Sequence, residues 1–120
     1  MTVLIVDDDA DQLNLRSMVL AKNGFETLQA LDKASAKTLA ALHHPEAAVI
    51  DLRLPTESEG LELLRALKLG DSAIRLLVLT GASADAVRHT PEANIIDDVL
   101  TKPASVRELI AHLRRYERNA

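Results

Sequence analysis

Four short apolar runs of the chain each end in a polar side chain suited to phosphoryl transfer. VLIVDDD carries Asp7 and Asp8, AAVIDLRLP carries Asp51, LLVLTGA carries Thr80, and VLTKP carries Lys102. Carboxylates that lie within about 4 Å of one another repel, so they protonate, move apart or share a cation. An all-oxygen site of this kind suits Mg²⁺, with Mn²⁺ as an alternative ion. The residue types therefore predict a metal-assisted site at which a carboxylate accepts a phosphoryl group.

Each side chain has a predicted role. Asp51 is the candidate nucleophile, because a metal-neutralised phosphoryl group can be attacked by a carboxylate. Asp8 and Asp51, with Asp7 as a third candidate, are predicted to hold the ion. Lys102 offers a compact positive charge to the phosphoryl group, and the hydroxyl of Thr80 can donate to it.

Simpler explanations exist for several of these residues. Acids before a helix often only cap it, and this is the role predicted for Asp9. Taken alone, Asp51 could form a turn and Thr80 could cap a following helix. His43 and His44 are adjacent on a predicted helix and point in different directions, so they are not a predicted metal pair.

Apolar strand-like runs alternate with helical patterns along the chain, as in βαβ units. The predicted strands are Val3–Val6, Phe25–Gln29 (at an edge), Ala47–Ile50, Leu76–Leu79 and Val99–Thr101. The first two predicted helices are Ala10–Lys22, with Leu15, Met18 and Val19 inward, and Ala34–His43. A third helix follows Gly60 and ends at Gly70, with Leu61, Leu64 and Leu67 inward, and a short fourth, Ser83–His89, is followed by irregular chain because of Pro91. The last predicted helix is Ser105–Arg118, with Val106, Leu109, Ile110 and Leu113 on one face.

This alternation predicts an α/β fold, a doubly wound five-stranded parallel sheet with helices on both faces. In such sheets, ligands bind beyond the carboxyl ends of the strands. The four apolar runs above would bring their polar residues together at that edge.

Composition sets the remaining limits. The 120 residues fit one domain, they contain no Cys, and 18 acids against 14 Lys and Arg give a net charge of −4. Phe25 and Tyr116 are the only aromatic residues, and there is no basic stripe, so direct nucleic-acid binding is not expected. Without a signal peptide or a long apolar run, we expect a cytoplasmic protein that makes no membrane contact.

The four motifs VDDD, VIDLRLP, LTGA and LTKP, in this order, resemble the receiver domains of bacterial two-component response regulators, over essentially residues 1–120. The resemblance implies the flavodoxin-like strand order 2-1-3-4-5. It also implies that Asp51 is the phospho-acceptor, that Asp7 and Asp8 are the acid pair, that Arg53 offers its backbone carbonyl to the metal, and that Lys102 precedes Pro103 across a cis bond.

The implied partners are a histidine kinase or phosphotransfer protein and an unknown downstream partner or effector domain. Such a domain is not an enzyme in the ordinary sense, because it catalyses only its own phosphorylation and dephosphorylation.

The chain departs from the family pattern at four places. Val99 stands where an aromatic switch residue is common, and Pro91 interrupts the fourth helix. The loop between Pro55 and Gly60 is one residue longer than usual, which would bring Glu57 or Glu59 near the metal. Arg53 and Ala82 occupy the two positions that tune phosphate lifetime in this family.

Two other functions remain open at this stage. One is a Mg²⁺-dependent aspartyl-phosphate phosphohydrolase, although such enzymes usually carry a second acid where this chain has Arg53. The other is a receiver-like scaffold that works unphosphorylated, which Val99 and Pro91 favour.

Overall fold

A five-stranded parallel sheet forms the centre of the molecule in this computed structural model, which describes residues 1–81 and 84–118. Its strands are β1 (Thr2–Val6), β2 (Glu26–Ala30), β3 (Ala47–Asp51), β4 (Arg75–Thr80) and β5 (Asp98–Thr101). They lie in the order β2-β1-β3-β4-β5 and every neighbouring pair is parallel. The predicted strands and their order are confirmed, and each observed boundary lies within one residue of the expected one.

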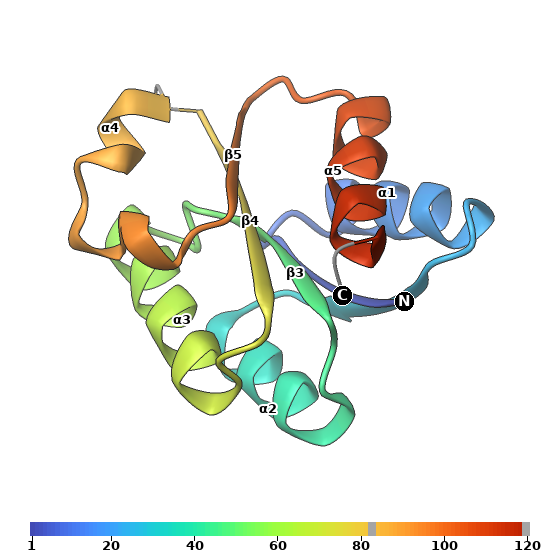
Figure 1. Cartoon of the computed structure of the whole chain (residues 1–120), viewed down its shortest axis with the longest axis horizontal. Helices are drawn as coiled ribbons and strands as arrows, with labels where there is room; N and C mark the ends of the chain where they lie inside the picture. The colour runs from blue at the N-terminus through green and yellow to red at the C-terminus, as the bar shows by residue number, and fades with distance from the viewer. Residues whose placement is uncertain (82–83, 119–120) are drawn as a thin grey trace.

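Helices cover both faces of this sheet. Helices α1 (Ala10–Lys22) and α5 (Val106–Arg118) lie together on one face, whereas α2 (Lys33–His43) and α3 (Glu57–Gly70) lie on the other (Figure 1). The short helix α4 (Ala84–Arg88) follows β4. Each connection runs from the carboxyl end of one strand through a helix to the next strand, so the loops that follow the strands gather at one edge.

The strands are continuously apolar because each face of the sheet has its own core. Side chains alternate between the faces of a strand. Val3 and Ile5 accordingly pack with Leu13, Leu109 and Leu113 under α1 and α5. Leu4, Val6, Ala36, Leu63 and Leu64 belong to the opposite core under α2 and α3.

The predicted inward face of α1 is wrong. Leu15 and Met18 are 51% and 53% exposed and Val19 is half-buried, whereas Leu13, Ser17 and Leu20 are buried. The helix has two apolar stripes that overlap in sequence, and packing chooses the one that also places Ser17 Oγ 2.7 Å from Thr27 Oγ1 on β2.

Helix α3 begins at Glu57, four residues before the expected start after Gly60. Thr56 caps it, its hydroxyl accepting the backbone N–H of Glu59 at 3.3 Å. Gly60 therefore lies within the helix, where a Cβ atom would come 1.8 Å from the carbonyl oxygen of Leu52. This glycine lets α3 approach the end of β3 closely. Leu64 and Leu67 are buried as predicted, and Leu61 is half-buried.

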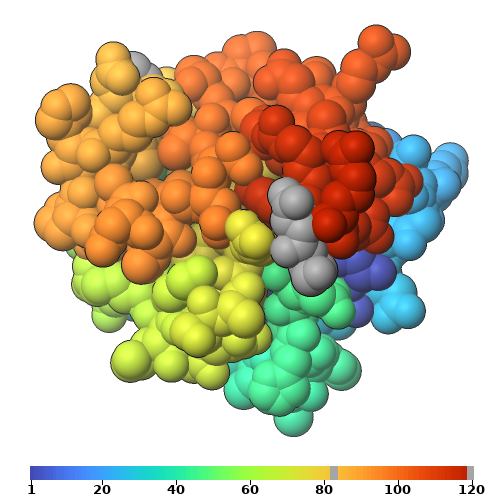
Figure 2. All heavy atoms as spheres, viewed as in Figure 1, coloured from blue at the N-terminus to red at the C-terminus, as the bar shows by residue number. Residues whose placement is uncertain are grey.

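The chain after α4 is more regular than predicted. Thr90 is followed by a 3-10 helix, η1 (Pro91–Ile95), whose first turn begins with the proline. Proline suits this position because the N–H that it lacks would have no partner within the helix. Residues 91–95 pack beside α3, as the space-filling view shows (Figure 2), and Arg65 of α3 forms an ion pair with the buried Glu92.

Two further predicted helices are close to the observed ones. α2 begins one residue earlier than expected, at Lys33. Ser105 precedes α5 as its cap, its Oγ accepting the N–H of Glu108 at 3.1 Å. Leu109 and Leu113 of α5 are buried as predicted, together with Tyr116, whereas Val106 and Ile110 are half-buried. Within residues 1–81 and 84–118, no helix is long and apolar enough to span a bilayer.

Candidate phosphoryl-acceptor site

The predicted side chains meet at the carboxyl edge of the sheet. Asp51 and Thr80 are the last residues of β3 and β4, Asp7 follows β1 directly, and Lys102 follows β5 directly. These strand ends border a cavity of about 380 Å³ lined by Asp8, Asp51, Leu52, Arg53, Glu57, Thr80, Gly81 and Lys102. Because the neighbouring strands are parallel, residues that are distant in sequence lie together at their carboxyl ends.

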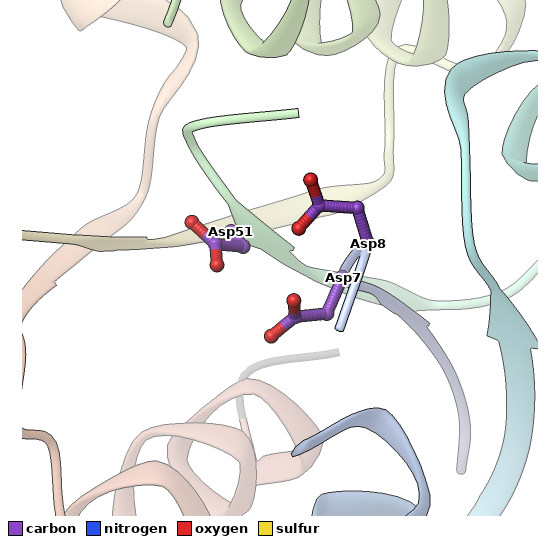
Figure 3. A group of neighbouring side chains, drawn as sticks. All are labelled: Asp7, Asp8 and Asp51. Carbon is purple, nitrogen blue, oxygen red and sulfur yellow. The ribbon is translucent and has the colours of Figure 1, made fainter. Parts of the chain in front are cut away.

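Three carboxylates form the acidic part of this site. Asp7, Asp8 and Asp51 each offer an oxygen within 4.8 Å of the others (Figure 3). Asp7 and Asp51 are 1% and 7% exposed, and Asp8 is exposed. Carboxylates this close repel one another unless a cation offsets their charge. Their oxygen-only chemistry and part-solvated position fit Mg²⁺, which keeps several waters.

A lysine completes the pocket at Asp51. Lys102 Nζ donates to Asp51 Oδ2 at 2.5 Å, and the other oxygen, Oδ1, accepts the backbone N–H of Arg53 at 3.2 Å. The backbone N–H of Lys102 also donates to the carbonyl of Thr80 at 2.7 Å. The lysine is thereby fixed to β4 by its backbone while its ammonium reaches across to β3.

Asp7 has a cationic partner that sequence reasoning did not find. Arg16 Nη1 on α1 lies 2.5 Å from Asp7 Oδ2, and Asp7 Oδ1 accepts the backbone N–H of Asp9 at 2.9 Å. Arg16 lies eight residues beyond Asp8 in the sequence, and no motif there marks it as a partner of Asp7. Asp9 caps α1 as predicted, because its Oδ1 accepts the N–H groups of Asp11 and Gln12.

The remaining predicted site residues have different outcomes. The Lys102–Pro103 bond is cis, as expected, and Leu54–Pro55 is a second cis bond that was not predicted. Thr80 is 4% exposed and lines the cavity. The role of the Arg53 carbonyl as a metal ligand stays a prediction. Ala82 lies outside the described residues.

The longer loop was expected to bring either Glu57 or Glu59 near the metal, and the structure separates the two residues. Glu57 lines the cavity, whereas Glu59 lies 4.0 Å from Lys33 and borders a different hollow beside Pro55. Val99, the position that lacks the aromatic residue, is half-buried beside a separate cavity of about 290 Å³ between α4 and α5.

A larger cavity, of about 820 Å³, lies at the amino ends of the strands beside Met1, Glu46 and Arg75. None of the predicted site residues lines it. The chemistry of the side chains, rather than the size of the hollow, therefore locates the candidate site.

Comparison with known proteins agrees with the fold and identifies the family. Residues 3–114 match the family model of the response regulator receiver domain. The chain is 34% identical to the transcriptional regulatory protein PrrA of Mycobacterium tuberculosis over 112 residues, 93% of this chain and 48% of that protein. The chain belongs to the response regulator receiver domain family, which serves two-component signalling rather than metabolic catalysis, and it spans about half the length of the curated relatives that it matches.

Solved structures show the same arrangement. The Francisella response regulator 1452 receiver domain superimposes with a TM-score of 0.87 at 28% identity, over 99% of this chain and 98% of that one. A response regulator from Burkholderia pseudomallei, whose structure holds a phosphorylated aspartic acid, a calcium ion and citrate, has a TM-score of 0.82 at 30% identity, over 92% of this chain and 64% of that one.

Proposed function

We propose that Asp51 accepts a phosphoryl group from a histidine kinase or a phosphotransfer protein in a Mg²⁺-dependent reaction. The observation that carries this proposal is the contact of Lys102 with Asp51 beside the carboxylates of Asp7 and Asp8. The phosphorylated aspartate and calcium ion in the Burkholderia relative support it. Family membership also supports a cytoplasmic location, which stays a prediction.

In the proposed transfer, a carboxylate oxygen of Asp51 forms a bond to phosphorus. The bond from phosphorus to the donor nitrogen breaks, and its electron pair stays on that nitrogen. Asp7, Asp8 and Asp51 would hold the divalent ion, with the Arg53 carbonyl as a further ligand, and the ion would offset the charge of the phosphoryl oxygens. Lys102 would exchange its bond to the carboxylate for a bond to the phosphoryl group.

Phosphorylation adds about −1.5 to −2 charges and three acceptor oxygens. The hydroxyl of Thr80 and the ammonium of Lys102 both line the cavity and can donate to these oxygens. Their movement would bias the chain after β4 and β5 and so alter the surface offered to a downstream partner or effector domain. The tuning positions Arg53 and Ala82, and Val99 in place of an aromatic residue, would set the lifetime and reach of this change.

Acetyl phosphate with and without Mg²⁺ tests the proposal by intact-protein mass spectrometry. We expect one acid-labile phosphoryl group that requires Mg²⁺ and that Asp51→Asn abolishes. Asp85→Asn, an equal change at an exposed position on α4, should label like the wild type. Undiminished labelling of Asp51→Asn would remove Asp51 from this role.

The same samples distinguish the two other functions. Repeated turnover of small phosphate esters would identify a phosphohydrolase, and absence of labelling at any Mg²⁺ concentration would favour the unphosphorylated scaffold. For a working switch, we expect phosphorylation to shift the amide resonances of Gly81 and of α4.

A further inference from the structure

A buried carboxylate outside the phosphoryl-acceptor site lies where the chain between β4 and β5 meets α3. Glu92, the second residue of η1, is 6% exposed, and its Oε1 forms an ion pair with Nη1 of Arg65 on α3. Its other oxygen, Oε2, is buried and has no hydrogen-bond partner within residues 1–81 and 84–118. In this part of the chain, a single guanidinium therefore offsets the buried charge, and it does so at one of the two oxygens.

The two partners of this ion pair differ in their access to water. The side chain of Arg65 is 57% exposed, so it loses little hydration in the pair and regains it when the pair opens. The carboxylate of Glu92 has lost its hydration, and an ionised group that stays buried without a partner is strongly unfavourable. Opening of the pair is therefore favourable only if Glu92 also moves out to water, and η1 must move with it.

Glu92 belongs to a segment that connects two strands of the acceptor site. Residues 84–96 run from α4 through η1 toward β5, on the α3 side of the sheet (Figure 1). The segment follows β4, which ends at Thr80, and precedes β5, which is followed by Lys102. Its internal hydrogen bonds, such as that from the Thr90 backbone N–H to the Val87 carbonyl at 3.0 Å, can persist while the segment moves as a unit.

Two kinds of contact hold this segment against the molecule. Val87 of α4 is fully buried in the core under α2 and α3, and Ile95 and Ile96 pack against the same core. The Arg65–Glu92 pair joins η1 to α3. Replacement of a buried ion pair by apolar side chains of similar volume is often neutral or stabilising. At this contact the chain therefore carries a pair that holds η1 less firmly than an apolar contact would.

We propose that the Arg65–Glu92 ion pair is a latch that sets how readily residues 84–96 move away from α3. In the closed form the pair is made, and in the open form both side chains are hydrated and η1 has left α3. The partly compensated charge of Glu92 keeps the two forms close in free energy. The link to phosphorylation rests on the proposed function: a movement of Thr80 toward a phosphoryl group on Asp51 would pull on the segment at α4 and so favour the open form.

Hydrogen exchange of the unphosphorylated protein tests the latch, because the backbone N–H groups of Thr90 and Ala93 lie within the segment. Arg65→Ala leaves Glu92 buried without its cation, and we expect exchange of these amides to accelerate at least about tenfold. Glu92→Met removes the charge and keeps an unbranched side chain of similar length, and we expect exchange to slow about threefold or more. The two partners of one ion pair should thus act in opposite directions.

Two further variants separate the latch from a general effect of lost positive charge. In the Glu92→Met background, Arg65→Ala should change exchange less than about twofold, because no buried charge remains to be compensated. Arg88→Ala removes a cation from the same segment, but its partner Asp85 is exposed, so it too should change exchange less than about twofold.

Faster exchange in Arg65→Ala together with slower exchange in Glu92→Met is the result that supports the latch. Faster exchange in both variants would show that the pair is an ordinary stabilising contact. That result would overturn the latch and leave the proposed function intact.

Acetyl phosphate with Mg²⁺ tests the link to the acceptor site. Glu92→Met should be labelled to the same extent as the wild type, but phosphorylation should shift its α4 amide resonances less. Shifts equal to those of the wild type would overturn the link. Absence of labelling in the wild type, with exchange rates as expected, would overturn the proposed function and the link while the latch itself stands.

Discussion

Asp51 and Asp7 are held by the same kinds of contact, but their cationic partners differ in exposure. Each carboxylate has one oxygen on a backbone N–H and the other on a cationic side chain, Lys102 for Asp51 and Arg16 for Asp7. Lys102 is 35% exposed at its side chain, whereas Arg16 is 15% exposed on α1. Lys102 can thus exchange partners with little desolvation, while Arg16 ties α1 to the end of β1.

Arg16→Ala tests the second of these contacts. Without a cation, the variant leaves Asp7 buried with less compensation, and we expect its free energy of unfolding to fall by about 1–3 kcal/mol. Mg²⁺ then offsets the same charge, so saturating Mg²⁺ should stabilise the variant more than the wild type. Urea unfolding in chelator and in Mg²⁺ measures both effects.

Arg88→Ala is the control for this comparison, because its pair with Asp85 is exposed on both sides. It should change stability little under either condition. An identical gain from Mg²⁺ in Arg16→Ala and the wild type would show that Arg16 does not compete with the ion for Asp7.

At the scale of elements, the approach of α3 to β3 depends on one residue. The contact of Gly60 with the Leu52 carbonyl leaves no room for a methyl group. Gly60→Ala should lower the free energy of unfolding by at least about 2 kcal/mol, since α3 must move away from the sheet. Thermal unfolding of the variant measures this loss.

Gly70→Ala is the matched control at the other end of α3. Nothing lies within 4 Å of the Cβ atom that it would add, so it should be neutral or stabilise by up to about 1 kcal/mol through helix propensity. If both substitutions were equally mild, α3 would not be fixed by the approach at Gly60.

The elements also show what the sequence could and could not predict. Asp7, Asp8, Asp51, Thr80 and Lys102 were assigned to one site because the carboxyl ends of parallel strands share an edge, a consequence of topology alone. The inward face of α1 was mistaken because Leu13 and Leu20 compete with Leu15 and Met18 at similar helical spacing. Only the packing of α1 against β2 and α5 decides between these stripes, and the partnership of Arg16 depends on the same rotation.

At the scale of the whole molecule, Tyr116 links α5 to the sheet, and its contacts predict how stability depends on pH. Its ring is 6% exposed, its hydroxyl donates to Asp98 Oδ2 at 2.5 Å, and the Arg75 guanidinium lies 5.7 Å from the ring centroid. Burial, and next the hydrogen bond to Asp98, raise the pKa of Tyr116 well above its ordinary value. His112 and Arg115 also face Asp98, at 3.2 and 3.9 Å.

Because the folded state holds the phenol proton more tightly than the unfolded state, this contribution to stability is complete below the unfolded pKa of about 10. Above that pH it is lost at up to about 1.4 kcal/mol per pH unit. Between pH 8 and 11, the free energy of unfolding should therefore fall more steeply for the wild type than for Tyr116→Phe. Parallel curves for the two proteins would contradict the prediction.

The position of β5 affects how a change at Asp51 could be transmitted to the surface of the molecule. It is an outermost strand, bonded to the rest of the sheet only through β4, and Lys102 stands at its end. With neighbouring strands about 4.8 Å apart, the side chains of Lys102 and Asp51 together connect strands β5 and β3 across roughly 10 Å. A protein bound along that margin would be able to sense an acyl phosphate on the central aspartate through a single side chain, without reaching into the pocket itself.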